Sequence, residues 1–150
     1  MKKKLLAVLM TGVMAASFAG TATVVSADSG DDNTLTVWAW DQNFNIKSMQ
    51  MAGEQYAKDH EGFSVDIIET SSDDCQTKLT TAANAGDYST LPDIVLMQDN
   101  SYQKYLKSYL DAFTDLKDMD INWDDFGKLK QSYSMVDDTH YGVPFDNGAV

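Results

Sequence analysis

The chain has 150 residues, of which 43% are apolar, and this is enough for one small domain with a hydrophobic core. Its eleven basic residues are all lysines, and 23 carboxylates oppose them, which gives a formal net charge of −12. A surface of this sign repels phosphate groups, so the composition argues against nucleic acid and anionic membranes as partners.

The first 27 residues have the pattern of a signal peptide. Lysines at positions 2–4 precede the mostly apolar stretch 5–14, and Val25-Ser26-Ala27 has the small-x-Ala form of a signal-peptidase site. A transmembrane helix would need about twenty unbroken apolar residues, and polar and small residues interrupt this stretch. We therefore expect export, cleavage after Ala27 and no lipid anchor, because no cysteine follows the segment to accept a lipid.

A polar lead at residues 28–33 comes next, and the first buried element follows it. The run TLTVWAWDQ at 34–42 is short, nearly all apolar and rich in β-branched and aromatic residues. This pattern predicts a strand buried on both faces of a parallel sheet. Helical spacing of apolar side chains predicts a helix over 44–58, and the alternation in 63–69 predicts a second strand nearer the edge.

The signals for a second helix lie between residues 71 and 86. Ser71 followed by Asp74 has capping-box form, and Gly86 offers a left-handed end. Cys75 and Leu79 share one apolar face of this segment. A lone cysteine in that position is expected to act as a small buried hydrophobe rather than as a nucleophile.

The rest of the chain continues the alternation of strands and helices. DIVLM at 93–97 predicts a third strand, in a central position, and Ser101 is expected to cap the helix after it. Asn122 is expected to cap a fourth helix over 123–133 that turns Leu129 inward. A small hairpin follows it. Strands alternating with helices predict an α/β fold with a mainly parallel sheet flanked by helices.

Sequence motifs of common enzymes are absent: there is no Gly-x-Ser-x-Gly, no phosphate-binding glycine loop, no His-Glu-x-x-His and no Cys-x-x-Cys. Residues 118–124 imitate the start of a calcium loop, but Trp123 and Leu129 occupy the positions of the required glycine and glutamate. His60 and His140 are expected to be structural or solvent-facing. We expect no catalytic residue, no metal and no cofactor.

Polar and aromatic side chains gather instead where the predicted strands end. In open α/β sheets, ligands bind outside the carboxyl ends of the strands. An indole ring stacks on the C–H face of a sugar, and carboxylates and amides bind hydroxyl groups, so this set suits a neutral polyhydroxylated ligand. The alternative for Trp40 is core packing, because period two places it on the same side as Trp38. The set comprises Trp40, Asp41, Gln42, Asp99, Asn100, Asp146 and Asn147.

Three segments carry a resemblance to a known family. LTVWAWDQNFN at 35–45, the segment 73–106 with its Leu-Pro-Asp-Ile-Val, and HYGVPFDNGAV at 140–150 resemble the amino-terminal part of family 1 extracellular solute-binding proteins of ABC transporters, the carbohydrate-binding group. The resemblance implies a periplasmic-binding-protein-like fold of type II, with residues 34–150 as the first of two lobes and the chain as a fragment of a longer protein.

This resemblance also implies a function without catalysis. A monomer captures a sugar or oligosaccharide outside the cell, closes around it and delivers it to the permease subunits of an ABC importer. The implied ligand-binding residues are Trp40, Asp41, Gln42, Asp99, Asp146 and Asn147. Two alternatives stay open: a secreted carbohydrate-active enzyme, with two carboxylates about 5 to 9.5 Å apart across a scissile bond, and a binding protein for a peptide or a cationic solute.

Overall fold

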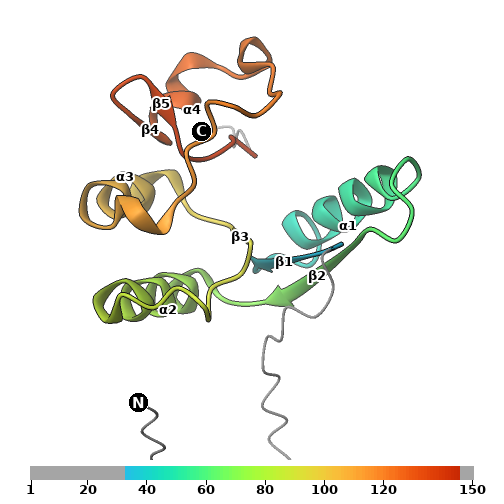
Figure 1. The fold of residues 1–150 in the computed structure, drawn as a ribbon, viewed down its shortest axis with the longest axis horizontal. Coiled ribbons are helices and arrows are strands. Elements are labelled where there is room, and N and C mark those ends of the chain that lie inside the picture. The colour runs from blue at the N-terminus through green and yellow to red at the C-terminus, as the bar shows by residue number, and fades with distance from the viewer. Residues whose placement is uncertain (1–32, 146–150) are drawn as a thin grey trace, which may run out of the picture.

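The computed structural model describes residues 33–145, so the predicted signal peptide and two predicted ligand-binding residues, Asp146 and Asn147, lie outside the described part. Helices and strands alternate through the first two thirds of it (Figure 1). The elements are β1 (Thr34–Ala39), α1 (Asn45–Tyr56), β2 (Ser64–Glu69), α2 (Ser72–Ala85), β3 (Ile94–Val95), α3 (Asp99–Ser108), the 3-10 turns η1 (Leu110–Ala112) and η2 (Trp123–Asp125), α4 (Lys128–Ser132), β4 (Met135–Val136) and β5 (Thr139–His140).

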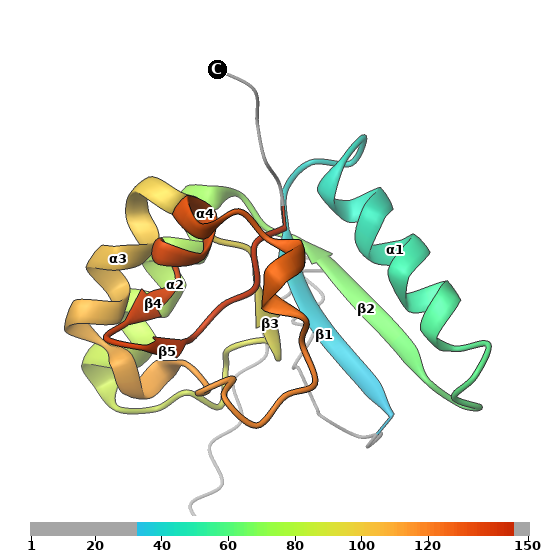
Figure 2. The ribbon, with the colours of Figure 1, turned by 90° about the horizontal axis from the view of Figure 1, so that it is seen from above.

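The first three strands of the chain form a parallel sheet in the order β2-β1-β3. Helix α1 lies on the β2 side of this sheet, whereas α2 and α3 lie on the β3 side (Figures 1 and 2). β1 pairs with β2 over its whole length and with β3 at Val37 and Trp38 only. The predicted α/β fold with a mainly parallel sheet and flanking helices is therefore confirmed.

Within the described residues, β3 does not take the central position predicted for the third strand. β3 is two residues long and forms an edge of the sheet made by residues 33–145, while β1 is the strand with two neighbours. An apolar run shows that a strand is buried, but it does not show how many strands pair with it. Among the described residues, the far edge of β3 carries no strand, and Ile94 is exposed.

A polar clamp sets the register between β1 and β3. The Asp93 carboxylate accepts hydrogen bonds from the backbone N–H and the hydroxyl of Thr36, both at 2.8 Å. The Asp93 N–H donates in return to the Thr36 hydroxyl at 3.0 Å. These bonds lower the pKa of the Asp93 carboxyl below its ordinary value, because they stabilise the charged form.

Apolar burial concentrates on β1, α2 and α3. The largest fully buried side chains are those of Leu79, Leu106, Val37 and Cys75. Ser71 accepts the N–H of Asp74 at 3.1 Å, and Gly86 ends α2 with a φ of 64°, so the predicted limits of this helix are confirmed. Burial raises the pKa of the Cys75 thiol to about 11, which keeps it protonated and unreactive at neutral pH.

Two predicted helix starts are wrong. α3 begins at Asp99 with Gln98 as its N-cap, so Ser101 lies inside the helix. The predicted fourth helix is broken into η2 and α4, and the side chain of Asn122 makes no capping bond. Leu129, which the helical spacing predicts to point inward, is 70% exposed. Because the chain does not form one continuous helix here, side chains at helical spacing no longer lie on one face.

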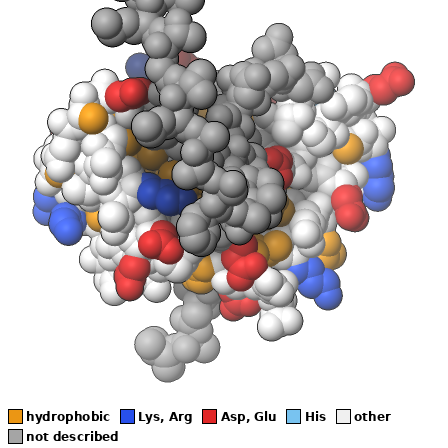
Figure 3. Space-filling model, turned by 90° about the horizontal axis from the view of Figure 1, so that it is seen from below, with side chains coloured by type: hydrophobic (Ala, Val, Ile, Leu, Met, Phe, Trp, Pro, Cys, Tyr) orange, Lys and Arg blue, Asp and Glu red, His pale blue; other side chains and the backbone are white. Residues whose placement is uncertain are grey.

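The last described elements form the hairpin that the sequence predicts. β4 and β5 are antiparallel, with Met135 opposite His140, and Asp137 takes a left-handed φ of 52° in the turn. Seen from below, the surface of the molecule carries carboxylates and lysines interspersed with small apolar patches (Figure 3). Within residues 33–145, no helix is both long and apolar enough to cross a membrane.

Candidate functional site

The three parallel strands end at one edge of the sheet. Ala39 ends β1 opposite Glu69, which ends β2, and the N–H of Thr70 donates to the Ala39 carbonyl at 2.8 Å. The N–H of Leu96, just after β3, donates to the Trp38 carbonyl at 3.0 Å. The residues at and just after the strand ends (40–45, 69–71 and 96–99) therefore emerge together, and we call them the carboxyl edge.

The two tryptophans of the first strand separate into different environments. Trp38 is 6% exposed, and the Lys78 ammonium lies 4.8 Å from the centre of its ring. Trp40 follows the last residue of β1 and is only partly buried. Trp38 is therefore a core residue, whereas part of the Trp40 side chain remains accessible at the carboxyl edge.

Asp41 starts the connection to α1. One oxygen of its carboxylate accepts the backbone N–H groups of Asn43 at 2.9 Å and Phe44 at 3.2 Å. Its carbonyl accepts the N–H of Ile46 at 2.9 Å. Asp41 is exposed, so the same carboxylate that shapes this turn can also be reached by a ligand.

Gln42 joins the ends of two strands. Its side-chain amide donates to the Glu69 carboxylate at 2.7 Å, and both residues are exposed. Sequence reasoning did not select Glu69, although its place as the last residue of a strand was a usable signal. The pair gives the carboxyl edge an oriented amide and a carboxylate in direct contact.

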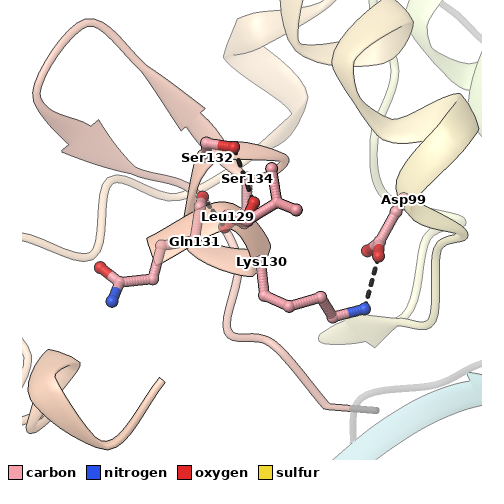
Figure 4. Close-up of polar contacts among 6 residues, drawn as sticks. All are labelled: Asp99, Leu129, Lys130, Gln131, Ser132 and Ser134. Atoms are coloured by element: carbon pink, nitrogen blue, oxygen red, sulfur yellow. Dashed lines mark hydrogen bonds and ion pairs between the residues drawn. The ribbon is translucent and has the colours of Figure 1, made fainter. Parts of the chain in front are cut away.

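Asp99 is placed at the carboxyl edge by the start of α3, and it is not alone. Its carboxylate is 2.5 Å from the Lys130 ammonium, which reaches it from α4 (Figure 4). The side chain of Lys130 is 23% exposed and that of Asp99 is 44% exposed. Sequence reasoning missed Lys130, because 31 residues separate the two partners and no local pattern links them.

Two phenyl rings and a buried amide complete the surroundings. Phe44, before α1, and Phe145 are both exposed, with ring centres 6.0 Å apart and planes tilted by 56°. Asn45 is buried in the first turn of α1, and its side-chain carbonyl has no hydrogen-bond partner within the described residues. None of these three residues was selected from the sequence.

The histidines have structural partners. His60 stacks on Tyr56 with 3.7 Å between ring centres, and its Nδ1 lies 2.9 Å from the Tyr56 carbonyl. His140 stacks on Trp123 at 3.6 Å, and its Nε2 lies 3.1 Å from the Gln131 side-chain oxygen. Within residues 33–145, no group of three potential ligands could hold a metal ion.

The carboxyl edge thus combines a partly exposed indole with carboxylates and an amide, each placed by the end of a strand or the start of a helix, and the Lys130 ammonium reaches it from α4. Such groups bind hydroxyl-rich ligands through stacking and charge-assisted hydrogen bonds. Four of the six predicted ligand-binding residues, Trp40, Asp41, Gln42 and Asp99, come together at this edge. Asp146 and Asn147 are outside the described residues.

Comparison with known proteins gives two matches. Residues 51–150 match a family described as bacterial extracellular solute-binding protein. A lactose-binding protein of Rhizobium radiobacter is 40% identical over 114 residues, which are 76% of this chain. The chain spans only 27% of the length of that curated relative. The family consists of binding proteins that act outside the cell, and our chain belongs to this family of bacterial extracellular solute-binding proteins.

Proposed function

We propose that the chain is part of the substrate-binding component of an ABC importer, which captures a sugar or oligosaccharide outside the cell and delivers it to the membrane permease. The observation that supports this most is the carboxyl edge itself, where Trp40 is partly exposed beside Asp41, Gln42 and Asp99. The 40% identity to a lactose-binding protein agrees with a sugar ligand.

In this proposal the described lobe supplies one wall of the site. The indole of Trp40 stacks on the apolar face of a sugar ring, while Asp41 and Asp99 accept hydrogen bonds from its hydroxyls. Asp146 and Asn147 add polar contacts from the segment after Phe145. A second lobe closes over the ligand by a hinge motion, and the permease recognises the closed, monomeric form.

Calorimetric titration of the complete protein tests this function. We expect lactose or another neutral sugar of a panel to bind with a dissociation constant in about the micromolar range, which corresponds to about 8 kcal/mol of binding free energy. Amino acids and short basic peptides serve as controls for the solute class. Binding of a peptide without binding of any sugar would contradict the proposal.

The proposed binding role excludes turnover of the sugar. After long incubation with oligosaccharides, the complete protein should leave every one of them intact on chromatography. Cleavage that is lost when Asp41 or Asp99 is replaced by asparagine would identify a carbohydrate-active enzyme instead.

Export is the remaining part of the proposal. We expect the secreted product to begin at Asp28 and to carry no lipid. Amino-terminal sequencing and mass spectrometry of that product provide the measurement. A product that starts at Met1, or one that carries a diacylglycerol adduct, would refute this part.

A further inference from the structure

We propose that Lys130 determines specificity in the sugar site: by pairing with Asp99 it balances the charge at that end of the carboxyl edge and restricts the site to uncharged sugars. This inference rests on the proposed function. It assigns a role to a residue that the sequence did not single out, and it predicts which derivatives of one sugar the protein rejects.

The position of Lys130 is imposed by the packing of α4 against α3. The side-chain amide nitrogen of Gln103, on α3, lies 3.1 Å from the carbonyls of Ser132 and Tyr133 and 2.9 Å from that of Met135. One side chain therefore fixes the end of α4 and the start of β4 to the helix that begins with Asp99. The two partners of the ion pair are held on elements that are joined independently of the pair.

α4 is also held from its other side. The Gln131 amide nitrogen donates to the carbonyls of Trp123 at 2.8 Å and Phe126 at 2.7 Å, both in or next to η2. Figure 4 shows Gln131 and Lys130 leaving α4 in opposite directions, with Lys130 directed at Asp99. Because neighbouring residues fix the orientation of this short helix, the Lys130 ammonium is aimed at the carboxyl edge and is not a freely moving surface lysine.

The charges at the carboxyl edge explain what this pair can do. Asp41 and Glu69 are exposed carboxylates at this edge, and Glu69 accepts a hydrogen bond from the neutral amide of Gln42. Asp99 differs from them because its carboxylate is paired with the Lys130 ammonium. A sugar hydroxyl can donate to the Asp99 carboxylate or accept from the Lys130 ammonium while the ion pair stays intact. A charged ligand is repelled by the member of the pair that has the same charge. It also competes with that member for the group of opposite charge.

This arrangement predicts opposite selectivity changes for the two single substitutions. Lys130→Met leaves the Asp99 carboxylate without its cation, so an amino sugar should gain affinity relative to the neutral sugar. Asp99→Asn leaves the Lys130 ammonium without its anion, so a sugar acid should gain affinity relative to the neutral sugar. A charge-assisted hydrogen bond is worth about 1.5 kcal/mol or more, so each ratio of affinities should change by about tenfold.

The experiment measures competition for the sugar site of the complete protein with two matched series: galactose, galactosamine and galacturonate, and glucose, glucosamine and glucuronate. The wild type should bind the neutral member of a series more tightly than both charged members. Lys130→Met should raise the affinity of the amine relative to the neutral sugar, and Asp99→Asn should raise that of the acid. In the double variant Lys130→Met/Asp99→Asn, both ratios of affinities should return close to the wild-type values.

The matched control is Lys117→Met, which breaks the exposed ion pair between Lys117 and Asp115 (3.1 Å) in the loop after α3 and should change no ratio. Melting temperatures of all variants separate folding from selectivity, since a purely structural role would weaken all sugars alike. If the amine competes no better in Lys130→Met than in the wild type, the inference is overturned. If the wild type binds no sugar at all, the proposed function itself fails.

Discussion

The sheet region, residues 33–95, and the region after α3, residues 110–145, are held together by different interactions. In the sheet region, β1 contributes Val37, Trp38 and Ala39 to the core, and α2 adds further buried apolar side chains. Between residues 110 and 145, Ser134 is the only buried residue. There, side-chain amides and hydroxyls donate to backbone carbonyls and connect short turns to each other and to α3.

This difference indicates how stability is distributed around the site. Burial of apolar area stabilises by about 25 cal/mol per Å² and involves all the apolar side chains that β1 and α2 bury. A neutral hydrogen bond contributes only about 1 kcal/mol net, and it depends on one geometry. We therefore expect the sheet region to supply most of the free energy of unfolding, and residues 110–145 to open locally at a lower free energy.

The largest expected effect comes from Leu79→Ala in the sheet region. Leu79 is 1% exposed on α2, so the truncation removes buried area and leaves a cavity, which should cost about 2 to 5 kcal/mol of unfolding free energy. Denaturant titration provides the measurement. The matched control is Leu129→Ala on α4, which is 70% exposed and should change stability by about 0.5 kcal/mol or less. Equal losses in both variants would remove the contrast between the two regions.

The second effect concerns ligand affinity at the border of the sheet region. Trp40→Ala removes the stacking surface after β1 and should weaken sugar binding by about 1 to 3 kcal/mol, a ten- to hundredfold rise in the dissociation constant measured by calorimetry. Trp38→Ala should lower the melting temperature instead, because Trp38 is 6% exposed. Unchanged affinity with a lowered melting temperature in Trp40→Ala would show that Trp40 is also core.

The sheet region is the part of the fold that the sequence predicts well. Period-two and continuous apolar patterns located β1 and β2, and the cap at Ser71 and the left-handed Gly86 located α2 within a residue. These signals are local: each depends on neighbours within one or two turns of chain. The edge position of β3 depends on pairing between distant segments, and the same local pattern fits a central strand as well as an edge strand.

Residues 110–145 show why the rest was not predictable. The pattern over 123–133 fits one amphipathic helix, but Gln131 donates to the carbonyls of Trp123 and Phe126 and stabilises a break between η2 and α4. The candidate site has the same limitation. The strand ends selected Trp40 and Asp99, whereas Lys130 enters only because the tertiary fold brings α4 to the start of α3.

The third prediction tests the hydrogen bonds that attach the second region to α3. Gln103→Ala removes the donor to the carbonyls of Ser132, Tyr133 and Met135 and should cost about 1 to 2 kcal/mol, because partly buried carbonyls lose their partner. Hydrogen exchange measured by mass spectrometry should accelerate in residues 128–140 and stay unchanged in β1 and β2. Gln50→Ala, at an exposed position on α1, is the control. Faster exchange throughout the sheet would show that the two regions unfold as one unit.

The smallest expected effect is the acid dependence of the clamp between β1 and β3. The pKa of Asp93 is lowered in the folded state by the backbone N–H and the hydroxyl of Thr36, so the unfolded chain takes up a proton at higher pH than the folded chain does. The clamp's contribution is therefore complete above the ordinary carboxyl pKa and is lost as pH falls through the lowered one, below about pH 4.

Asp93→Asn removes this titration. The free energy of unfolding of the wild type should therefore approach that of the variant as pH falls from about 5 to 3. Above that range, the difference between the two free energies should be constant. Gln50→Ala, at an exposed position on α1 whose side chain does not titrate, is the control and should show no such convergence. Denaturant midpoints measured across this pH range give the two difference curves. A difference for Asp93→Asn that stays constant down to the lowest pH would mean that the clamp does not depend on the charge of Asp93, and that β3 is held in register by its two ladder pairs alone.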